Sequence, residues 1–316
     1  MPNYNGVWSL STQYQYAADW PLIPDNSFFV SGNSDSTRNI IETFNFNSSG
    51  INTDFGDMTT SREKPSVGAS TTRGIIAGGD AGGNATSGTN VIDFITFASQ
   101  GDATDFGDMS VTRSNISGGM SSATRAVFAG GFVNGNTLQN VMDYVTISSA
   151  GNASDFGNLT VARRNVGGLM SPTRGVICGG NGANAFNTMD YITIANTGNA
   201  TDFGDLTVAR YPPASCSSTT RGIIAGGYTG SGNSDVIDYI TIGSTGNASD
   251  FGNLVAAGNG GAAVSNSIKA GMGGFDNDQD IQIITIATTG NSVDFGSLTV
   301  GRKGMNGLSP THGGIA

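Results

Sequence analysis

Asp202-Phe203-Gly204-Asp205-Leu206-Thr207-Val208-Ala209-Arg210 is the stretch that decides the fold, because close copies of it recur along the chain. The tripeptide Asp-Phe-Gly begins at Asp54, Asp105, Asp155, Asp202, Asp250 and Asp294, at intervals of 44 to 51 residues. Each copy ends a longer frame, in which an apolar segment, a Gly-Gly pair and an apolar-acidic-aromatic segment follow one another. Such a period indicates a repeat architecture that fills nearly all of the 316 residues.

The frames read as β-structure. Each offers about four short segments rich in Val, Ile, Thr, Tyr and Phe, separated by Gly, Asn, Ser and Asp, which is typical of strands and turns. No segment shows the 3.6-residue period of an amphipathic helix. A repeat of roughly 40 to 50 residues with four strands is what one propeller blade requires. Six frames therefore predict an all-β, six-bladed propeller with four-stranded blades.

The frame resembles the kelch repeat over residues 27 to 316. Its glycine pairs are Gly78-Gly79, Gly130-Gly131, Gly179-Gly180, Gly226-Gly227 and Gly273-Gly274, with Ser31-Gly32 in the first frame. Its tyrosine position is read as Tyr144, Tyr191 and Tyr239, with Phe94 and Ile284 in two other frames. The sequence departs from the family by carrying Phe where kelch repeats usually carry Trp. The resemblance implies a kelch-type propeller and a protein-binding role.

The two ends of the repeat region complement each other. Residues 27–32 match a second strand with no first strand before it, and residues 304–312 match a first strand. We therefore expect the C-terminal strand to complete the first blade, which leaves no free sheet edge at the seam. The expected domains are an N-terminal arm, residues 1–25, and the propeller, residues 26–316.

Most arginines fall at two positions of the repeat rather than being scattered. The first set is Arg62, Arg113, Arg163, Arg210 and Arg302, and the second set is Arg73, Arg125, Arg174 and Arg221. Aspartates recur beside the tyrosine position and in the Asp-Phe-Gly copies, of which Asp105, Asp155, Asp202 and Asp250 are assigned to the same structural network. We predict bridges from arginine to carboxylate or carbonyl groups between strands or blades. A ring of arginines that binds an anionic ligand is the alternative.

Catalytic constellations are not found in the sequence. His312 is the one histidine, so neither a Ser-His-Asp arrangement nor a histidine metal site is supported. Asp276, Asp278 and Asp280 alternate as in a calcium loop, but Ile281 stands where such a loop requires Gly. We predict no catalytic residue, no metal and no cofactor. Cys178 and Cys216 are expected to be buried thiols.

Charge and hydropathy limit the partners. The net charge of −10 disfavours nucleic acid, whose phosphates need clustered Lys and Arg. No run approaches 18 apolar residues, so no membrane insertion is expected.

The loops differ in how much they vary between frames. The turn before Asp-Phe-Gly keeps its length, and its asparagines Asn152, Asn199 and Asn247 are interpreted as turn formers rather than glycosylation acceptors. The loop between the second and third strands varies in length and content. Variable loops on a rigid scaffold commonly carry binding residues. Aromatic residues there, predicted to contact a partner protein or glycan or else to cover the blade edge, are Phe132, Phe186, Tyr228 and Phe275.

The N-terminal arm is rich in aromatic residues. It holds both tryptophans, Trp8 and Trp20, and three of the eight tyrosines, including Tyr14 and Tyr16. Such enrichment outside the core favours a docking peptide, with an arm packed on the propeller as the alternative.

Two phrases also resemble structural proteins of marine tailed bacteriophages. They are the opening Tyr4-Asn5-Gly6-Val7-Trp8-Ser9-Leu10-Ser11 with Trp20-Pro21, and the repeated Gly-Asn-Ala-Thr-Asp-Phe-Gly-Asp-Leu. This resemblance implies a non-enzymatic tail, fibre or capsid-surface protein located in the virion. Its expected partners are other virion proteins, through the arm, and a host-surface receptor or glycan. An intracellular kelch scaffold that binds a protein partner is the alternative.

Overall fold

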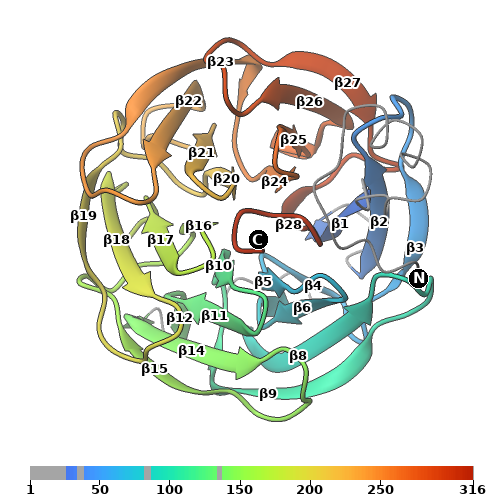
Figure 1. The fold of residues 1–316 in the computed structure, drawn as a ribbon, viewed down its shortest axis with the longest axis vertical. Coiled ribbons are helices and arrows are strands. Elements are labelled where there is room, and N and C mark those ends of the chain that lie inside the picture. The colour runs from blue at the N-terminus through green and yellow to red at the C-terminus, as the bar shows by residue number, and fades with distance from the viewer. Residues whose placement is uncertain (1–25, 34–38, 82–86, 134–136, 316) are drawn as a thin grey trace, which may run out of the picture.

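The computed structural model describes residues 26–33, 39–81, 87–133 and 137–315, which form a ring of six four-stranded antiparallel sheets (Figure 1). The prediction of an all-β, six-bladed propeller is thereby confirmed. Within the described residues, the helical element is the single 3-10 turn η2 (Phe275–Asn277). The predicted arm, residues 1–25, lies outside the described residues.

Each blade is numbered by its order along the chain and is given from its innermost to its outermost strand. Blade 1 contains β28 (Lys303–Leu308), β1 (Asn26–Asn33), β2 (Ile40–Asn45) and β3 (Thr53–Asp57), and blade 2 contains β5 (Ser66–Ala69), β6 (Arg73–Ala77), β8 (Thr89–Thr96) and β9 (Thr104–Arg113). Blade 3 contains β10 (Gly118–Ser121), β11 (Arg125–Ala129), β14 (Val141–Thr146) and β15 (Ser154–Asn158), and blade 4 contains β16 (Gly167–Met170), β17 (Arg174–Cys178), β18 (Thr188–Thr193) and β19 (Thr201–Asp205). Blade 5 contains β20 (Ala214–Ser217), β21 (Arg221–Ala225), β22 (Ser234–Thr241) and β23 (Ser249–Gly258), and blade 6 contains β24 (Ala262–Ser265), β25 (Lys269–Gly273), β26 (Asp280–Thr285) and β27 (Val293–Ser297). Two short ladders join β4 (Arg62–Glu63) to β7 (Asp80–Ala81) and β12 (Phe132–Val133) to β13 (Thr137–Leu138).

The ring closes through the C-terminal strand, as predicted. Strand β28 pairs antiparallel with β1, with Leu308 opposite Phe28 and Asn306 opposite Val30. Figure 1 shows the two ends of the colour scale, blue β1 and red β28, side by side in one blade. Closure therefore depends on residues from both ends of the propeller.

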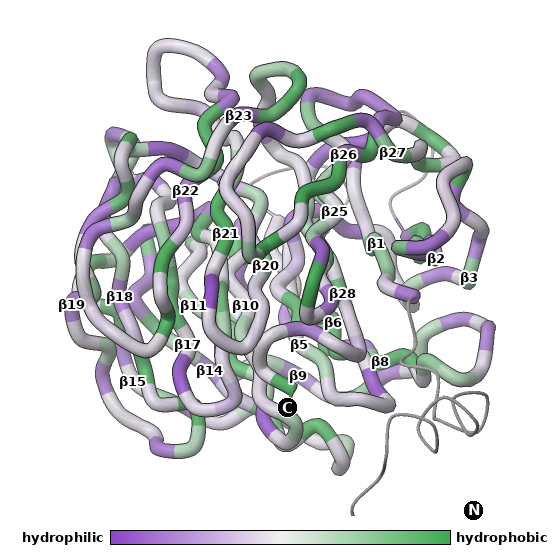
Figure 2. The backbone as a smooth tube through the Cα atoms, turned by 45° about the horizontal axis from the view of Figure 1, so that its top comes forward, coloured by the Kyte–Doolittle hydropathy of each residue, from purple (hydrophilic) through white to green (hydrophobic). Residues whose placement is uncertain are grey.

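The hydrophobic core lies between the blades. One cluster joins Leu169 and Val176 of blade 4 to Ile224 and Ile240 of blade 5, all at most 3 % exposed. Hydrophobic stretches (green) recur along the strands, and many of the turn segments are white or purple (Figure 2). Burying one such side chain contributes about 1.5–3 kcal/mol, so every blade depends on its neighbours for stability.

The three residues of the repeated tripeptide have different surroundings: Phe lies in the core, Gly lies against the next blade, and Asp is exposed to solvent. Phe203 is 2 % exposed and belongs to the core. The glycine allows close approach: at Gly157, where φ is +140°, a Cβ atom would lie 2.3 Å from the carbonyl oxygen of Gly198 in the next blade. The aspartates assigned to the ion-pair network are instead exposed on the outer strands, at Asp105, Asp155, Asp202 and Asp250. Charges at such edges oppose pairing with another sheet.

The strand register changes one assignment. Tyr191 lies opposite Thr201, and in blade 6 the residue opposite the corresponding Val293 is Ile283. Ile283, rather than Ile284, therefore occupies the tyrosine position, and its neighbour Gln282 occupies the recurring aspartate position. A shift of one residue matters because it moves a side chain to the other face of the sheet.

Candidate functional site

A three-residue cluster joins most of the blades to the next blade, and the interface between blades 4 and 5 shows it clearly. Arg210 follows β19 of blade 4, and its Nη2 lies 2.9 Å from Oδ2 of Asp238 on β22 of blade 5. The Thr207 hydroxyl donates a hydrogen bond of 2.6 Å to Oδ1 of the same aspartate. The charged side chains of both ion-pair partners are fully buried. Both carboxylate oxygens of Asp238 are therefore used to join the blades.

The same ion pair recurs around the ring. In the part of the chain that the structure describes, five of the six interfaces carry it, with N–O distances of 2.7 to 3.2 Å; the other four pairs are Arg62–Asp93, Arg113–Asp143, Arg163–Asp190 and Arg302–Glu42. A Ser or Thr hydroxyl donates to each acid, from Thr59, Ser110, Thr160, Thr207 and Thr299. Burial lowers the pKa of Arg62, and the charge of Asp93 opposes that change. Removing one partner of such a pair leaves a buried charge without compensation.

The interface between blades 5 and 6 differs at all three positions. Gly258 stands where Arg is expected, Gln282 replaces the acid, and Val255 replaces the Thr. Phe275 packs against the vacated position, because a Cβ atom on Gly258 would meet the Cβ of Phe275 at 2.6 Å. A buried ring thus takes the place of a buried guanidinium.

The second arginine set bridges the blades at their partly exposed edge. Arg125 of blade 3 lies 4.3 Å from the ring centroid of Tyr144 and donates to the carbonyl groups of Ile194 and Ala195 in blade 4. Arg73, Arg174 and Arg221 repeat this arrangement over Phe94, Tyr191 and Tyr239. In blade 6, Lys269 donates to the carbonyl oxygen of Phe46 in blade 1.

The four loop aromatic residues lie closer to the blade interfaces than the sequence suggested. Phe132 is 1 % exposed beneath the guanidinium of Arg164, and Phe275 is 6 % exposed. Tyr228 is partly buried and packs edge-on against Tyr211, with a centroid distance of 5.8 Å. Phe186 is also partly buried. Phe132, Tyr228 and Phe275 directly follow a Gly-Gly pair, and Phe132 and Phe275 have little surface to offer a partner.

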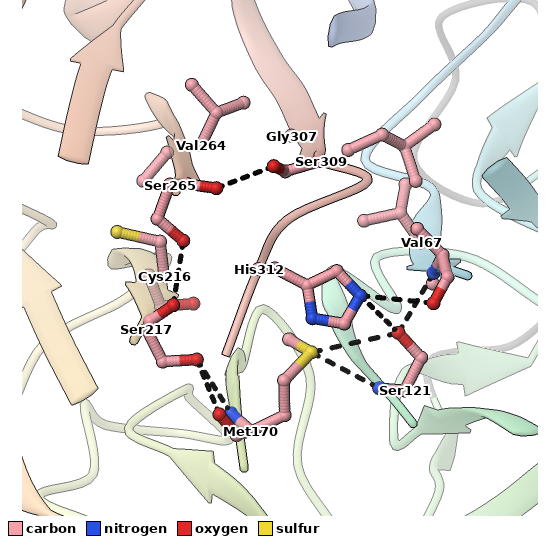
Figure 3. Close-up of a pocket in the computed structure, with 15 residues that line it drawn as sticks. Val67, Ser121, Met170, Cys216, Ser217, Val264, Ser265, Gly307, Ser309 and His312 are labelled. Atoms are coloured by element: carbon pink, nitrogen blue, oxygen red, sulfur yellow. Dashed lines mark hydrogen bonds between the residues drawn. The ribbon is translucent and has the colours of Figure 1, made fainter. Parts of the chain in front are cut away.

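The innermost strands meet around a narrow channel that serine side chains hold together (Figure 3). Ser217 Oγ donates to the carbonyl of Met170, Ser265 Oγ to that of Ser217, and Ser309 Oγ to that of Ser265, each across a blade boundary. The enclosed space measures about 30 Å³, which is room for one or two water molecules. The channel is therefore a packed axis and not a ligand pocket.

The C-terminal tail closes this channel with His312. Its Nε2 lies 3.1 Å from Ser121 Oγ and 3.0 Å from the carbonyl oxygen of Ala69 (Figure 3). Its Nδ1 accepts the N–H of Gly314. Nδ1 is thus unprotonated and Nε2 carries the proton, so Nε2 cannot serve as a base toward Ser121. Burial lowers the pKa of His312 to about 4, and the imidazole is neutral at pH 7.

Among the described residues, no group of three or more His, Cys, Asp or Glu side chains is placed to hold a metal ion, and this includes Asp276, Asp278 and Asp280. No helix in the described ranges is long and apolar enough to span a bilayer. Burial raises the pKa of the Cys178 and Cys216 thiols to about 12. The predicted docking residues Trp8, Tyr14, Tyr16 and Trp20 lie outside the described residues.

Fold and interfaces together define the class of the protein, a six-bladed β-propeller. Compared with known proteins, the chain matches no family model and no curated protein. The sequence reading missed the changed interface between blades 5 and 6. The available signal was Gly258, which stands eight residues after Asp250 where the five other frames have Arg, and the register adds Gln282 as the counterpart of Asp238.

Proposed function

We propose that the chain is a non-enzymatic structural component of a phage virion, in the tail, a fibre or the capsid surface. In this role the ring is a rigid body, and the side that carries the variable loops contacts a host surface or a neighbouring subunit. The resemblance of the repeat phrases to marine phage proteins suggests the setting, and the resemblance to kelch repeats suggests binding of proteins.

The observation that carries the proposal is a difference between the two sides of the ring: the turns on one side are uniform, and the loops on the other side vary. On one side the Gly-Asn turns join neighbouring blades. A side-chain oxygen in each turn accepts a backbone N–H from the preceding blade at 3.0 Å, at Asn152, Asn199, Asn247 and Asn291. On the other side the loops after the Gly-Gly pairs differ from blade to blade. A uniform scaffold with one variable side suits a protein that presents loops.

Purified virions from the source test this proposal directly. Antibody against the propeller should label intact particles in electron micrographs, and mass spectrometry should find the chain in them at a fixed copy number. A chain without residues 1–25 should fold but fail to join the particle if the arm docks it. A chain that never co-purifies with particles, while it captures a protein partner in cell extracts, would support an intracellular kelch scaffold instead.

A further inference from the structure

The interface between blades 5 and 6 opens into a groove on the outer surface. The groove measures about 370 Å³ and lies between residues 255–257 at the end of β23 and the loop that precedes β26. Four carboxylates line it: Asp276, Asp278, Asp280 and Asp294. All four residues are exposed, so a partner that approaches from solvent can reach them.

The charges in this groove lack cations of their own. No Lys or Arg lines the groove, and none of the ion pairs found within the described residues involves its four aspartates. The charge of Asp278, together with desolvation and Asp294, raises the pKa of Asp280. Asp276 is held by the side-chain amides of Asn233 and Asn259. The groove therefore concentrates uncompensated negative charge.

A buried amide also faces the groove. Gln282 is 6 % exposed and lines the groove. Its Oε1 accepts from the backbone N–H of Val255 at 2.9 Å and from Ser292 Oγ at 2.6 Å, which fixes the orientation of the amide. Within the described part of the chain no hydrogen bond from its Nε2 is found, so this group can donate to a bound acceptor such as a peptide carbonyl.

The walls add apolar surface suited to a long side chain. Val255 is 55 % exposed at the rim, beside Ala256 and Ala257. An arginine side chain combines an apolar stem with a planar guanidinium that binds carboxylates through two hydrogen bonds. The aspartates are not grouped to share one metal ion, which favours an extended cationic partner over a divalent cation.

We propose that this groove binds an arginine-bearing segment of a partner protein. The guanidinium lies among Asp278, Asp280 and Asp294, the stem packs on Val255, and a backbone carbonyl of the segment accepts from Gln282 Nε2. The partner thus supplies an arginine to the interface between blades 5 and 6, whereas the other five interfaces have an arginine of the chain itself. The proposal does not depend on the virion role, because isolated protein suffices to test it.

The test measures binding of a capped peptide Gly-Leu-Arg-Leu-Gly, and of the same peptide with citrulline in place of arginine, by isothermal titration calorimetry at low salt. Citrulline keeps the shape and removes the charge. We expect the arginine peptide to bind about tenfold more tightly. The double variant Asp278→Asn/Asp280→Asn should lose that preference. The matched variant Asp105→Asn/Asp155→Asn removes two exposed charges from other outer strands and should keep it.

Three results would overturn the proposal. The first is equal binding of the two peptides by the unmodified protein, which requires no variant and so does not depend on folding of a mutant. The second is an equal loss in both double variants, which would mean that only the overall negative charge of the protein attracts the peptide. The third is saturable binding of Ca²⁺ alone that depends on Asp278 and Asp280 and excludes the peptide.

Discussion

The interfaces on the two sides of blade 5 solve the same packing problem with different chemistry. Between blades 4 and 5, Arg210 and Asp238 form a buried ion pair 2.9 Å apart, supported by the Thr207 hydroxyl. Between blades 5 and 6, Gly258 and Gln282 occupy the equivalent positions, and the Phe275 ring fills the space. The three positions change together, because a lone Arg or a lone Asp buried there would lack its partner. The change keeps the ring closed and leaves acidic surface outside it.

The largest expected effect comes from breaking the first kind of interface. Arg210→Met leaves Asp238 buried without its cation and should lower the free energy of unfolding by about 3–5 kcal/mol. The double variant Arg210→Met/Asp238→Asn should recover a large part of that loss, since it removes the uncompensated charge as well. Urea unfolding followed by circular dichroism measures both. A loss below about 1 kcal/mol in the single variant would show that the ion pair contributes little.

Breaking the interface between blades 5 and 6 should lower the free energy of unfolding by somewhat less. Phe275→Ala creates a cavity between blades 5 and 6 and should lower the free energy of unfolding by about 3 kcal/mol. Phe186→Ala, in the corresponding loop of blade 4, is the control and should cost clearly less, because Phe186 is only partly buried. If the two variants are equally stable in the same urea titration, Phe275 does not replace the missing guanidinium.

The sequence was sufficient for the ring but not for this difference. The six Asp-Phe-Gly frames predict the blade number, because each repeat carries the pattern of one blade. The complementary ends predict the closing strand, because each end matches a strand that the other end lacks. The missing arginine is visible as Gly258, eight residues after Asp250, but the residue that replaces the acid needs the register, since Ile283 and Ile284 are both apolar and only strand pairing decides between them. Phe132 reads as a loop residue, yet Gly130 and Gly131, with φ of 70° and 99°, turn the chain so that its ring packs beneath Arg164. That contact joins residues that lie far apart in the sequence, and no local pattern encodes it.

The C-terminal tail provides a pH-dependent test of how much the interface between blades 5 and 6 relies on ring closure. Burial lowers the pKa of His312 from 6.5 to about 4, so the folded state binds the proton less readily than the unfolded chain. The stabilisation from the neutral imidazole is complete above pH 6.5 and is lost as the pH falls toward 4, by up to about 3 kcal/mol. His312→Gln should flatten the dependence of unfolding on pH in this window.

Hydrogen exchange locates the effect of the same acidification. At pH 4.5, compared with pH 7 and after correction for the intrinsic exchange rate, amides of β23 and β26 should lose more protection than amides of β19 and β22. This difference is expected because the interface between blades 5 and 6 has no buried ion pair. Equal loss of protection at both interfaces would show that the ring opens as one unit. The missing ion pair between blades 5 and 6 would then have no effect on local opening.

The smallest expected effect concerns a hydrogen bond that both interfaces share. Asn247 accepts the N–H of Asp205 between blades 4 and 5, and Asn291 accepts the N–H of Asn253 between blades 5 and 6, each at 3.0 Å. Asn247→Ala and Asn291→Ala should each lower the free energy of unfolding by about 1 kcal/mol, and Asn196→Ala, at an exposed turn position, should be neutral. Because the same bond is removed, any additional exchange of β23 amides in Asn291→Ala reflects the interface around it. If β19 amides respond as strongly in Asn247→Ala, the buried Phe275 ring holds blades 5 and 6 together as firmly as the ion pair holds blades 4 and 5.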